Sequence, residues 1–200
     1  MSYLVEEITS QPECWAKAIE MAASAGAALP TRGERVAVIG CGSSLNVARC
    51  YAALREAVGH GETDAFPASE VPATRRYDRM VYVSRTGTTT EVLDALRQAP
   101  ERARTTAVVA DPGSPLVREA GRVVLLDFAD ERSVVSSRFI TSSIVLLRAH
   151  LGADVRAPEV AGSGPQMRAE QHDRAGDEPA GHHGPLVGEV EQHHVARLAG

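Results

Sequence analysis

The chain has 200 residues, of which 44% are hydrophobic and 24% are charged, a size and composition typical of one globular domain or of one domain with a tail. Its formal net charge of −5 at pH 7 argues against a protein that binds the phosphate backbone of nucleic acids. No apolar run reaches the length of a membrane span and no signal peptide is evident, so we expect neither a nucleic-acid nor a membrane partner.

The first predicted elements are helical and cover residues 2–26. Apolar side chains recur there at helical spacing, at Val5, Ile8, Trp15, Ile19 and Ala22. Pro12 interrupts this pattern. Because proline is tolerated in the first turn of a helix, we predict that a second helix begins near Pro12, with Ser10 or Gln11 close to its cap. The N-terminal helical segment is assigned to residues 1–32.

Five short apolar runs follow, and each is typical of a buried strand. They cover residues 35–39, 63–66, 80–83, 105–110 and 123–126, and the pattern of the second is the weakest. Helical patterns lie between or after them at residues 45–58, from 92 onward, at 116–120 behind Ser114, and from Ser136 or Ser137 to Gly152. This alternation predicts an α/β fold: a doubly wound, mostly parallel five-stranded sheet with helices on both faces.

The periodic pattern ends after about Pro158. Residues 161–200 contain seven glycines, three prolines, five histidines and no aromatic residue. Such a segment buries too little apolar surface to offset the entropy of ordering it, so we predict a disordered C-terminal tail. A second interpretation is a frameshifted remnant, since a GC-rich gene read out of frame encodes a similar composition. We therefore expect an α/β domain at residues 33–155 and a Gly/His/Pro-rich tail at 156–200.

Two loops of the predicted domain are rich in glycine and hydroxyl groups. Residues 40–44 follow the first strand, residues 84–90 follow the third, and each loop begins a helix. A helix N-terminus offers unpaired N–H groups and a partial positive charge to an anion. In a sheet of order 2-1-3-4-5, strands one and three are neighbours at the switch point, so both loops line one crevice. We predict an anion site there, with simple helix capping as the alternative for either loop alone.

Nucleotide-binding and hydrolase motifs are incomplete in this sequence. Gly40 and Gly42 begin a dinucleotide fingerprint, but Leu45 stands where the third glycine is needed. Lys17 is the only lysine, so no phosphate-loop lysine follows a glycine-rich turn, and no G-x-S-x-G elbow is present. We therefore expect no nucleotide and no other cofactor.

Four segments together resemble the sugar isomerase (SIS) domain family: VAVIGCGSSLNVARCYAALREAVG, ASEVP, YVSRTGTTTEVLDAL and ERSVVSSRF. The resemblance spans about residues 8–152. The segments are similar to the isomerase part of glucosamine-fructose-6-phosphate aminotransferase and to related ketose-phosphate isomerases or deaminases. This resemblance implies a flavodoxin-like SIS fold, a phosphosugar ligand and a role in carbohydrate derivative metabolism.

The resemblance also implies which residues contact the ligand. By position, they are Ser43 and Ser44 in the first loop, Ser84, Arg85, Thr86 and Thr89 in the second, and Ser136 beyond them. The hydroxyls of the second loop hold the phosphate in this family. Arg85 replaces a glutamine that is often found there, which would add a charge near the phosphate.

Relatives of this kind carry two SIS domains in tandem, and the second supplies a catalytic glutamate, a histidine and, in the aminotransferase, a Schiff-base lysine. This chain resembles only the first, so we expect the catalytic half to be missing from it. Two functions stay open. One is a sugar-phosphate isomerase or aminotransferase-like enzyme, with a homodimer formed through the domain's helices in place of the tandem pair. The other is a non-catalytic module that binds or senses a phosphosugar.

Few residues remain as candidates for catalysis or metal binding. Glu70, Glu91 and Glu131 lie near the loops, and each is a candidate general base if burial raises its pKa. A first-turn helix acid and a loop cap are the structural alternatives for Glu91 and Glu131.

The sequence context of the cysteines and histidines indicates structural roles. Cys41, His150 and the pairs at 182–183 and 193–194 lack metal-ligand surroundings, so no metal site is expected. An odd, sparse count of three cysteines is typical of free thiols in a reducing cytoplasm.

Overall fold

The computed structural model describes residues 3–152, and the predicted tail at 156–200 lies outside the described residues. The N-terminal segment forms two helices, α1 (Tyr3–Thr9) and α2 (Gln11–Ala25). Pro12 stands in the first turn of α2 and Ser10 at its N-cap, as predicted. The Ser10 hydroxyl donates to the carbonyl of Glu7 at 3.1 Å instead of capping α2.

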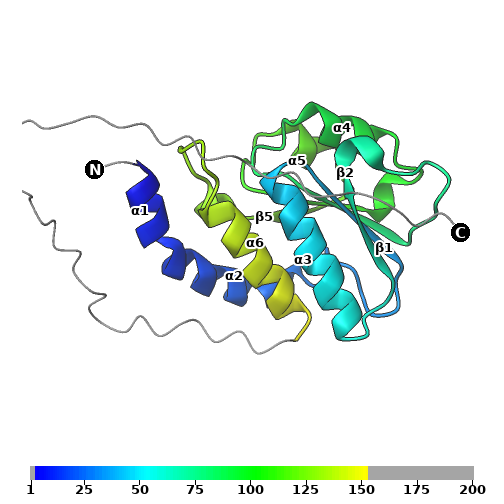
Figure 1. Ribbon diagram of the computed structural model, residues 1–200, viewed down its shortest axis with the longest axis horizontal. Coiled ribbons are helices and arrows are strands. Elements are labelled where there is room, and N and C mark those ends of the chain that lie inside the picture. Colours follow the sequence, from blue (N-terminus) through cyan, green and yellow to red (C-terminus); the bar gives the residue numbers. More distant parts are fainter. Residues whose placement is uncertain (1–2, 153–200) are drawn as a thin grey trace, which may run out of the picture. The chain divides into compact units, whose positions relative to one another are not determined.

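The sheet has five parallel strands in the order β2-β1-β3-β4-β5 (Figure 1). They are β1 (Val36–Gly40), β2 (Thr63–Pro67), β3 (Arg79–Val83), β4 (Thr105–Val109) and β5 (Arg122–Leu125). The three central strands are buried along their whole length, whereas β2 and β5 are only partly buried. The predicted fold class and sheet order are therefore confirmed.

Helices cover both faces of the sheet. On one face lie α2, α3 (Ser43–Ala57) and α6 (Arg138–His150), side by side in Figure 1. On the other lie α4 (Thr90–Arg97) and α5 (Pro115–Glu119). Three short 3-10 turns complete the described part: η1 (Ala68–Glu70), η2 (Arg102–Arg104) and η3 (Asp127–Ala129).

The strand pattern explains the two cores. Val36 and Val38 of β1 point to the α2–α3–α6 face, while Ala37 and Ile39 point to the α4–α5 face. Successive side chains of a strand alternate between faces, so an unbroken apolar run supplies both cores. Among the described residues, no helix is both long and apolar enough to cross a bilayer.

Arg55 ties the turns at the amino edge of the sheet together. Its side chain is fully buried near the end of α3. The guanidinium donates to the Thr63 hydroxyl at 3.1 Å and to four carbonyls, those of Pro30, Thr31, Glu34 and His60, at 2.9–3.2 Å. A buried charge is tolerated only when its hydrogen bonds are satisfied in this way. One side chain thus joins α3 to the chain segments entering β1 and β2.

We expect Arg55→Leu to lower the free energy of unfolding by about 3 kcal/mol, because it removes the donor that four carbonyls share, one of them buried and three partly buried. Urea unfolding followed by circular dichroism measures the change. Arg49→Leu, on the exposed face of the same helix, is the matched control and should change stability by less than about 0.5 kcal/mol. Equal losses in the two variants would mean that the Arg55 network contributes nothing specific.

Candidate anion site at the carboxyl edge of the sheet

The two hydroxyl-rich loops leave the sheet side by side. Gly40, the last residue of β1, is the register partner of Val83, the last residue of β3. Because β1 and β3 are parallel neighbours, residues 41–44 and 84–89 follow them at the same edge of the sheet. This is the point at which the order of the strands in the sheet reverses relative to the sequence. The predicted crevice between strands one and three thus has the strand arrangement that it requires.

The first loop depends on two glycines. A Cβ on Gly40 would lie 2.7 Å from the backbone of Ser44, so only glycine lets α3 begin this close to β1. Gly42 has a φ of +55°, a conformation that side chains disfavour. Ser43 is exposed at the start of α3, and Ser44 is buried behind it. The turn therefore brings the N-terminus of α3 to the crevice.

The second loop is organised by its own hydroxyl groups. The buried Ser84 Oγ accepts the N–H of Gly87 at 3.2 Å and lies 3.3 Å from the Thr89 hydroxyl. The Thr86 hydroxyl accepts from the Thr88 hydroxyl at 2.9 Å. Gly87 has a φ of +60°, and its carbonyl accepts the N–H of Leu116 at 3.2 Å. The loop is thus preformed and packed against α5.

The caps of three helices distinguish an anion site from ordinary capping. The N-cap residues of α3 and α4, Gly42 and Thr89, make no side-chain cap hydrogen bond. By contrast, Ser114 caps α5 by accepting the N–H of Val117. The hydroxyls of residues 84–89 therefore do not serve as caps of α4. In α3, the N–H groups of Ser44 and Leu45 already donate to the carbonyls of Cys41 and Gly42, at 3.1 Å each. The first-turn N–H groups of α4 have no side-chain cap and are left for another acceptor.

The Arg85 side chain extends along this edge to a third loop, the one that precedes α6. Its guanidinium lies 3.6 Å from the Asp130 carboxylate and donates to the backbone carbonyl of Glu131. The expected extra charge is therefore present at the edge but is partly neutralised by Asp130. Arg85 also connects the second loop to the loop that precedes α6.

Glu131 caps α6, which confirms its structural alternative. Its carboxylate is buried and accepts five hydrogen bonds, from the hydroxyls of Ser136 and Ser137 and from the N–H groups of Ser137, Arg138 and Phe139, at 2.6–3.2 Å. The Ser136 hydroxyl donates its one proton to Glu131, so that it can still accept a hydrogen bond from a ligand. Glu70 and Glu91 are exposed. None of the three glutamates is set in the buried, unpaired surroundings of a general base.

The remaining candidates have structural surroundings. Cys41 is half-buried in the first loop. His150 ends α6, with its Nε2 atom 3.0 Å from the Pro30 carbonyl. Within residues 3–152, no group of three metal-ligating side chains comes together. The histidine pairs at 182–183 and 193–194 lie outside the described residues.

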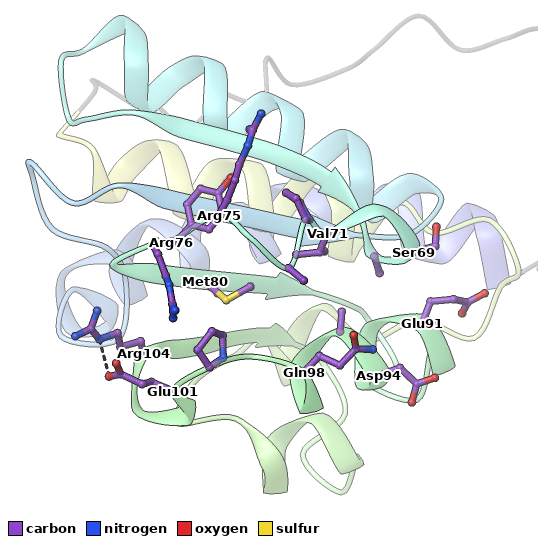
Figure 2. A pocket seen from close by; sticks show the side chains of 16 residues that line it. Ser69, Val71, Arg75, Arg76, Met80, Glu91, Asp94, Gln98, Glu101 and Arg104 are labelled. Atoms are coloured by element: carbon purple, nitrogen blue, oxygen red, sulfur yellow. Dashed lines mark ion pairs between the residues drawn. The ribbon is translucent and has the colours of Figure 1, made fainter.

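A cavity of about 320 Å³ lies away from the crevice, between α4 and the segment that links η1 to β3 (Figure 2). Met80 and Val71 line its middle, Arg76 lies toward one end, and Glu91 toward the other. None of the seven predicted ligand residues lines it. The residues that line this cavity are therefore different from those of the predicted anion site.

Sequence reasoning missed one buried carboxylate at this edge. Glu7 of α1 accepts hydrogen bonds from the N–H groups of Arg132 and Ser133, at 2.6 and 3.2 Å. The contact joins residues about 125 positions apart. Glu7 is the one buried residue of α1, and no local pattern in the sequence signals this burial.

The chain is similar to known proteins over most of its described residues. The family model described as "SIS domain" matches residues 31–151. Glutamine–fructose-6-phosphate aminotransferase [isomerizing] of Methanothermobacter thermautotrophicus is 32% identical over 131 residues, which are 64% of this chain and 22% of that protein.

Solved structures agree in fold. Glucosamine-6-phosphate deaminase of Thermotoga maritima is 28% identical, with a TM-score of 0.59 over 76% of this chain and 50% of the other. The C-terminal domain of the Francisella tularensis aminotransferase is 22% identical, with a TM-score of 0.64 over 76% and 46%. The chain thus spans about a fifth of the curated relative and about half of these two structures.

We expect Glu131→Ala to lower the free energy of unfolding by about 2–3 kcal/mol, because three buried or partly buried N–H groups lose their acceptor. Urea unfolding measures this loss. Glu91→Ala removes an exposed acid from the first turn of α4 and should cost no more than about 0.5 kcal/mol. The capping role of Glu131 would be refuted by equal losses.

Proposed function

Because this chain belongs to the SIS domain family over residues 31–151, we propose that it binds a phosphosugar, with the phosphate between the N-termini of α3 and α4. One observation carries the proposal: two adjacent helices present N-termini without a side-chain cap at one sheet edge, beside a hydroxyl-rich loop. Two helix ends and several hydroxyl donors are the groups that a phosphate dianion needs.

Each predicted ligand residue has a place in this proposal. Ser43 and Ser44 begin α3 on one side of the phosphate. On the other side, Thr86 and Thr89 offer half-buried hydroxyls, while the buried Ser84 holds the shape of their loop. Ser136 lies in the loop before α6, and we propose that it contacts the sugar.

We propose a hexose phosphate as the ligand class. The names of two relatives support it, since they specify fructose 6-phosphate and glucosamine 6-phosphate for those proteins. Arg85 is held by Asp130 at 3.6 Å, which leaves the neutral hydroxyls and the helix ends as the main phosphate contacts.

For this chain alone, the surroundings of its three candidate glutamates support binding without catalysis. Isomerisation of a ketose phosphate moves a proton between C1 and C2 through an enediol, and that step needs a base. Glu131 is committed to α6, while Glu70 and Glu91 are exposed. Isomerisation or aminosugar-phosphate deamination is therefore the second candidate, with the base supplied by another domain or another copy.

We propose that the partner is a second copy of this chain. Five exposed apolar side chains support this: Tyr3, Val5 and Ile8 of α1, and Val134 and Val135 of the loop before α6. The two groups adjoin, because the Arg132 guanidinium lies 5.4 Å from the centre of the Tyr3 ring. Exposed apolar patches of this kind mark interaction surfaces. The expected cytoplasmic location is supported by the free thiols of Cys14, Cys41 and Cys50.

Thermal unfolding tests the binding proposal. Saturating fructose 6-phosphate or glucosamine 6-phosphate should raise the midpoint by about 5 °C, because a ligand at 100 times its Kd stabilises by about 2.7 kcal/mol. The double variant Ser84→Ala, Thr86→Ala should lose this shift. The pair Ser24→Ala, Thr74→Ala, two exposed hydroxyl residues elsewhere, should keep it. If neither sugar phosphate shifts the wild-type protein, the proposal fails.

Proton exchange separates the two candidate functions. In D2O, a binding module leaves the C1 and C2 protons of the bound sugar phosphate unexchanged, whereas an isomerase replaces them with deuterium. We expect a thermal shift without exchange for this chain. Exchange at C1 or C2 above the protein-free rate, detected by proton NMR, would contradict the binding-only assignment and support an enzyme.

Sedimentation equilibrium tests the partner. We expect twice the mass of the chain for the wild type, and the mass of one chain for Val134→Asp, because a charge in an apolar interface is costly. Val58→Asp alters an exposed valine at the end of α3 and should remain dimeric. A monomeric wild type, or a Val134→Asp dimer, would contradict pairing through this surface.

A further inference from the structure

The loop that carries Ser136 is held from outside the SIS match by the N-terminal helix α1. Figure 1 shows α1 beside the loop that precedes α6. Glu7 reaches from α1 into this loop and accepts the N–H groups of Arg132 and Ser133, at 2.6 and 3.2 Å. The Ser133 hydroxyl also donates to the same carboxylate. The first part of the loop is therefore bound to a residue far away in the sequence.

The way in which α1 docks is unusual for a short helix. Helices ordinarily bury their apolar side chains and expose their acids. In α1 the arrangement is reversed: Glu7 is 3% exposed, whereas Tyr3, Val5 and Ile8 are each at least half exposed. A carboxylate is costly to bury unless donors surround it. The contact between α1 and the loop is therefore polar and directional, which suits the fixing of a loop conformation.

A second carboxylate holds the other end of the same loop. Glu131 binds the Ser136 hydroxyl at 2.6 Å and the N–H of Ser137 at 2.7 Å. Arg138 connects the two, since its guanidinium lies 3.8 Å from Glu7 and donates to the Asp130 carbonyl at 2.6 Å. The loop is thus fastened at two places: Glu7 holds residues 132–133, and Glu131 holds residues 136–138, including Ser136 itself.

The charge of Glu7 suits this role at neutral pH. Burial alone would raise its pKa, but the hydrogen bonds from Ser133 and Arg132, together with the Arg138 charge, hold the pKa of the Glu7 carboxyl below its ordinary value. The carboxylate is therefore ionised, and all of its donors stay engaged.

We propose that Glu7 is a positioning residue for phosphosugar binding: it holds residues 131–137 in the shape that places Ser136 against the sugar. This inference rests on the proposed function. It makes the N-terminal helix part of the binding apparatus, although α1 itself contributes no ligand contact. The α1 residue acts through Ser136, so its contribution should vanish when the Ser136 hydroxyl is absent.

The test is a double-mutant cycle on the full chain, with affinity for fructose 6-phosphate and glucosamine 6-phosphate measured by calorimetry. We expect Glu7→Ala to raise the Kd about tenfold and Glu7→Gln, which keeps one acceptor, by less. In a Ser136→Ala background, Glu7→Ala should change the Kd by less than about twofold, because coupled residues are not additive. Glu6→Gln, an exposed acid on the same helix, is the matched control and should leave the Kd unchanged.

Two readouts exclude a merely structural effect. Measurement at 10 °C, below the unfolding transition of each variant, keeps the proteins folded, so that a loss of global stability alone leaves the Kd unchanged. Hydrogen exchange should show the Arg132 and Ser133 amides exchanging about tenfold faster in Glu7→Ala or Glu7→Gln, with little change at Arg138.

Each outcome decides the inference. Faster exchange with an unchanged Kd, or a full tenfold loss retained in the Ser136→Ala background, overturns the positioning role and leaves the proposed function standing. If the Arg132 and Ser133 amides still exchange slowly in both variants, Glu7 does not hold this loop and the inference is overturned. If wild-type protein binds neither sugar phosphate, the proposed function falls, and the inference falls with it.

Discussion

The parallel pairing of β1 with β3 is the constraint on which the site depends. It places Gly40 opposite Val83, so that two helices, α3 and α4, begin at neighbouring points of one edge. The positive ends of their dipoles therefore meet at one edge, beside an arginine, Arg85, whose charge is partly neutralised by Asp130. The absence of a side chain on Gly40 is part of the same constraint, because its place is taken by the backbone of Ser44.

Polar side chains, rather than the apolar cores, determine the shape of the connections at both edges of the sheet. At the amino edge, Arg55 donates to four carbonyls of the two segments that enter β1 and β2. At the carboxyl edge, Glu131 and Glu7 accept N–H groups of a single loop, and Arg85 connects that loop to the hydroxyl-rich loop at residues 84–89. These contacts are directional, so they specify loop conformation in a way that apolar packing does not. The binding proposal depends on this second layer of organisation.

The sequence predicts the central strands well because β1, β3 and β4 are buried on both faces and read as continuous apolar runs. It predicts β2 weakly because this edge strand is only partly buried. The two loops are also visible, since glycines and hydroxyls cluster directly after strands. The roles of Glu7 and Arg55 are not, because their partners lie far along the chain or are backbone carbonyls, which leave no trace in the pattern of residue types.

The central claim is that a phosphosugar binds between the two hydroxyl-rich loops, and amide mapping by NMR tests it most directly. In a titration with glucosamine 6-phosphate, we predict shifts of the amides at residues 42–45 and 84–90, with smaller shifts near Ser136. Amides lining the separate cavity at Ala73, Arg76 and Gln98 should stay in place. Shifts confined to that cavity, or no shifts at saturating concentration, would contradict the account.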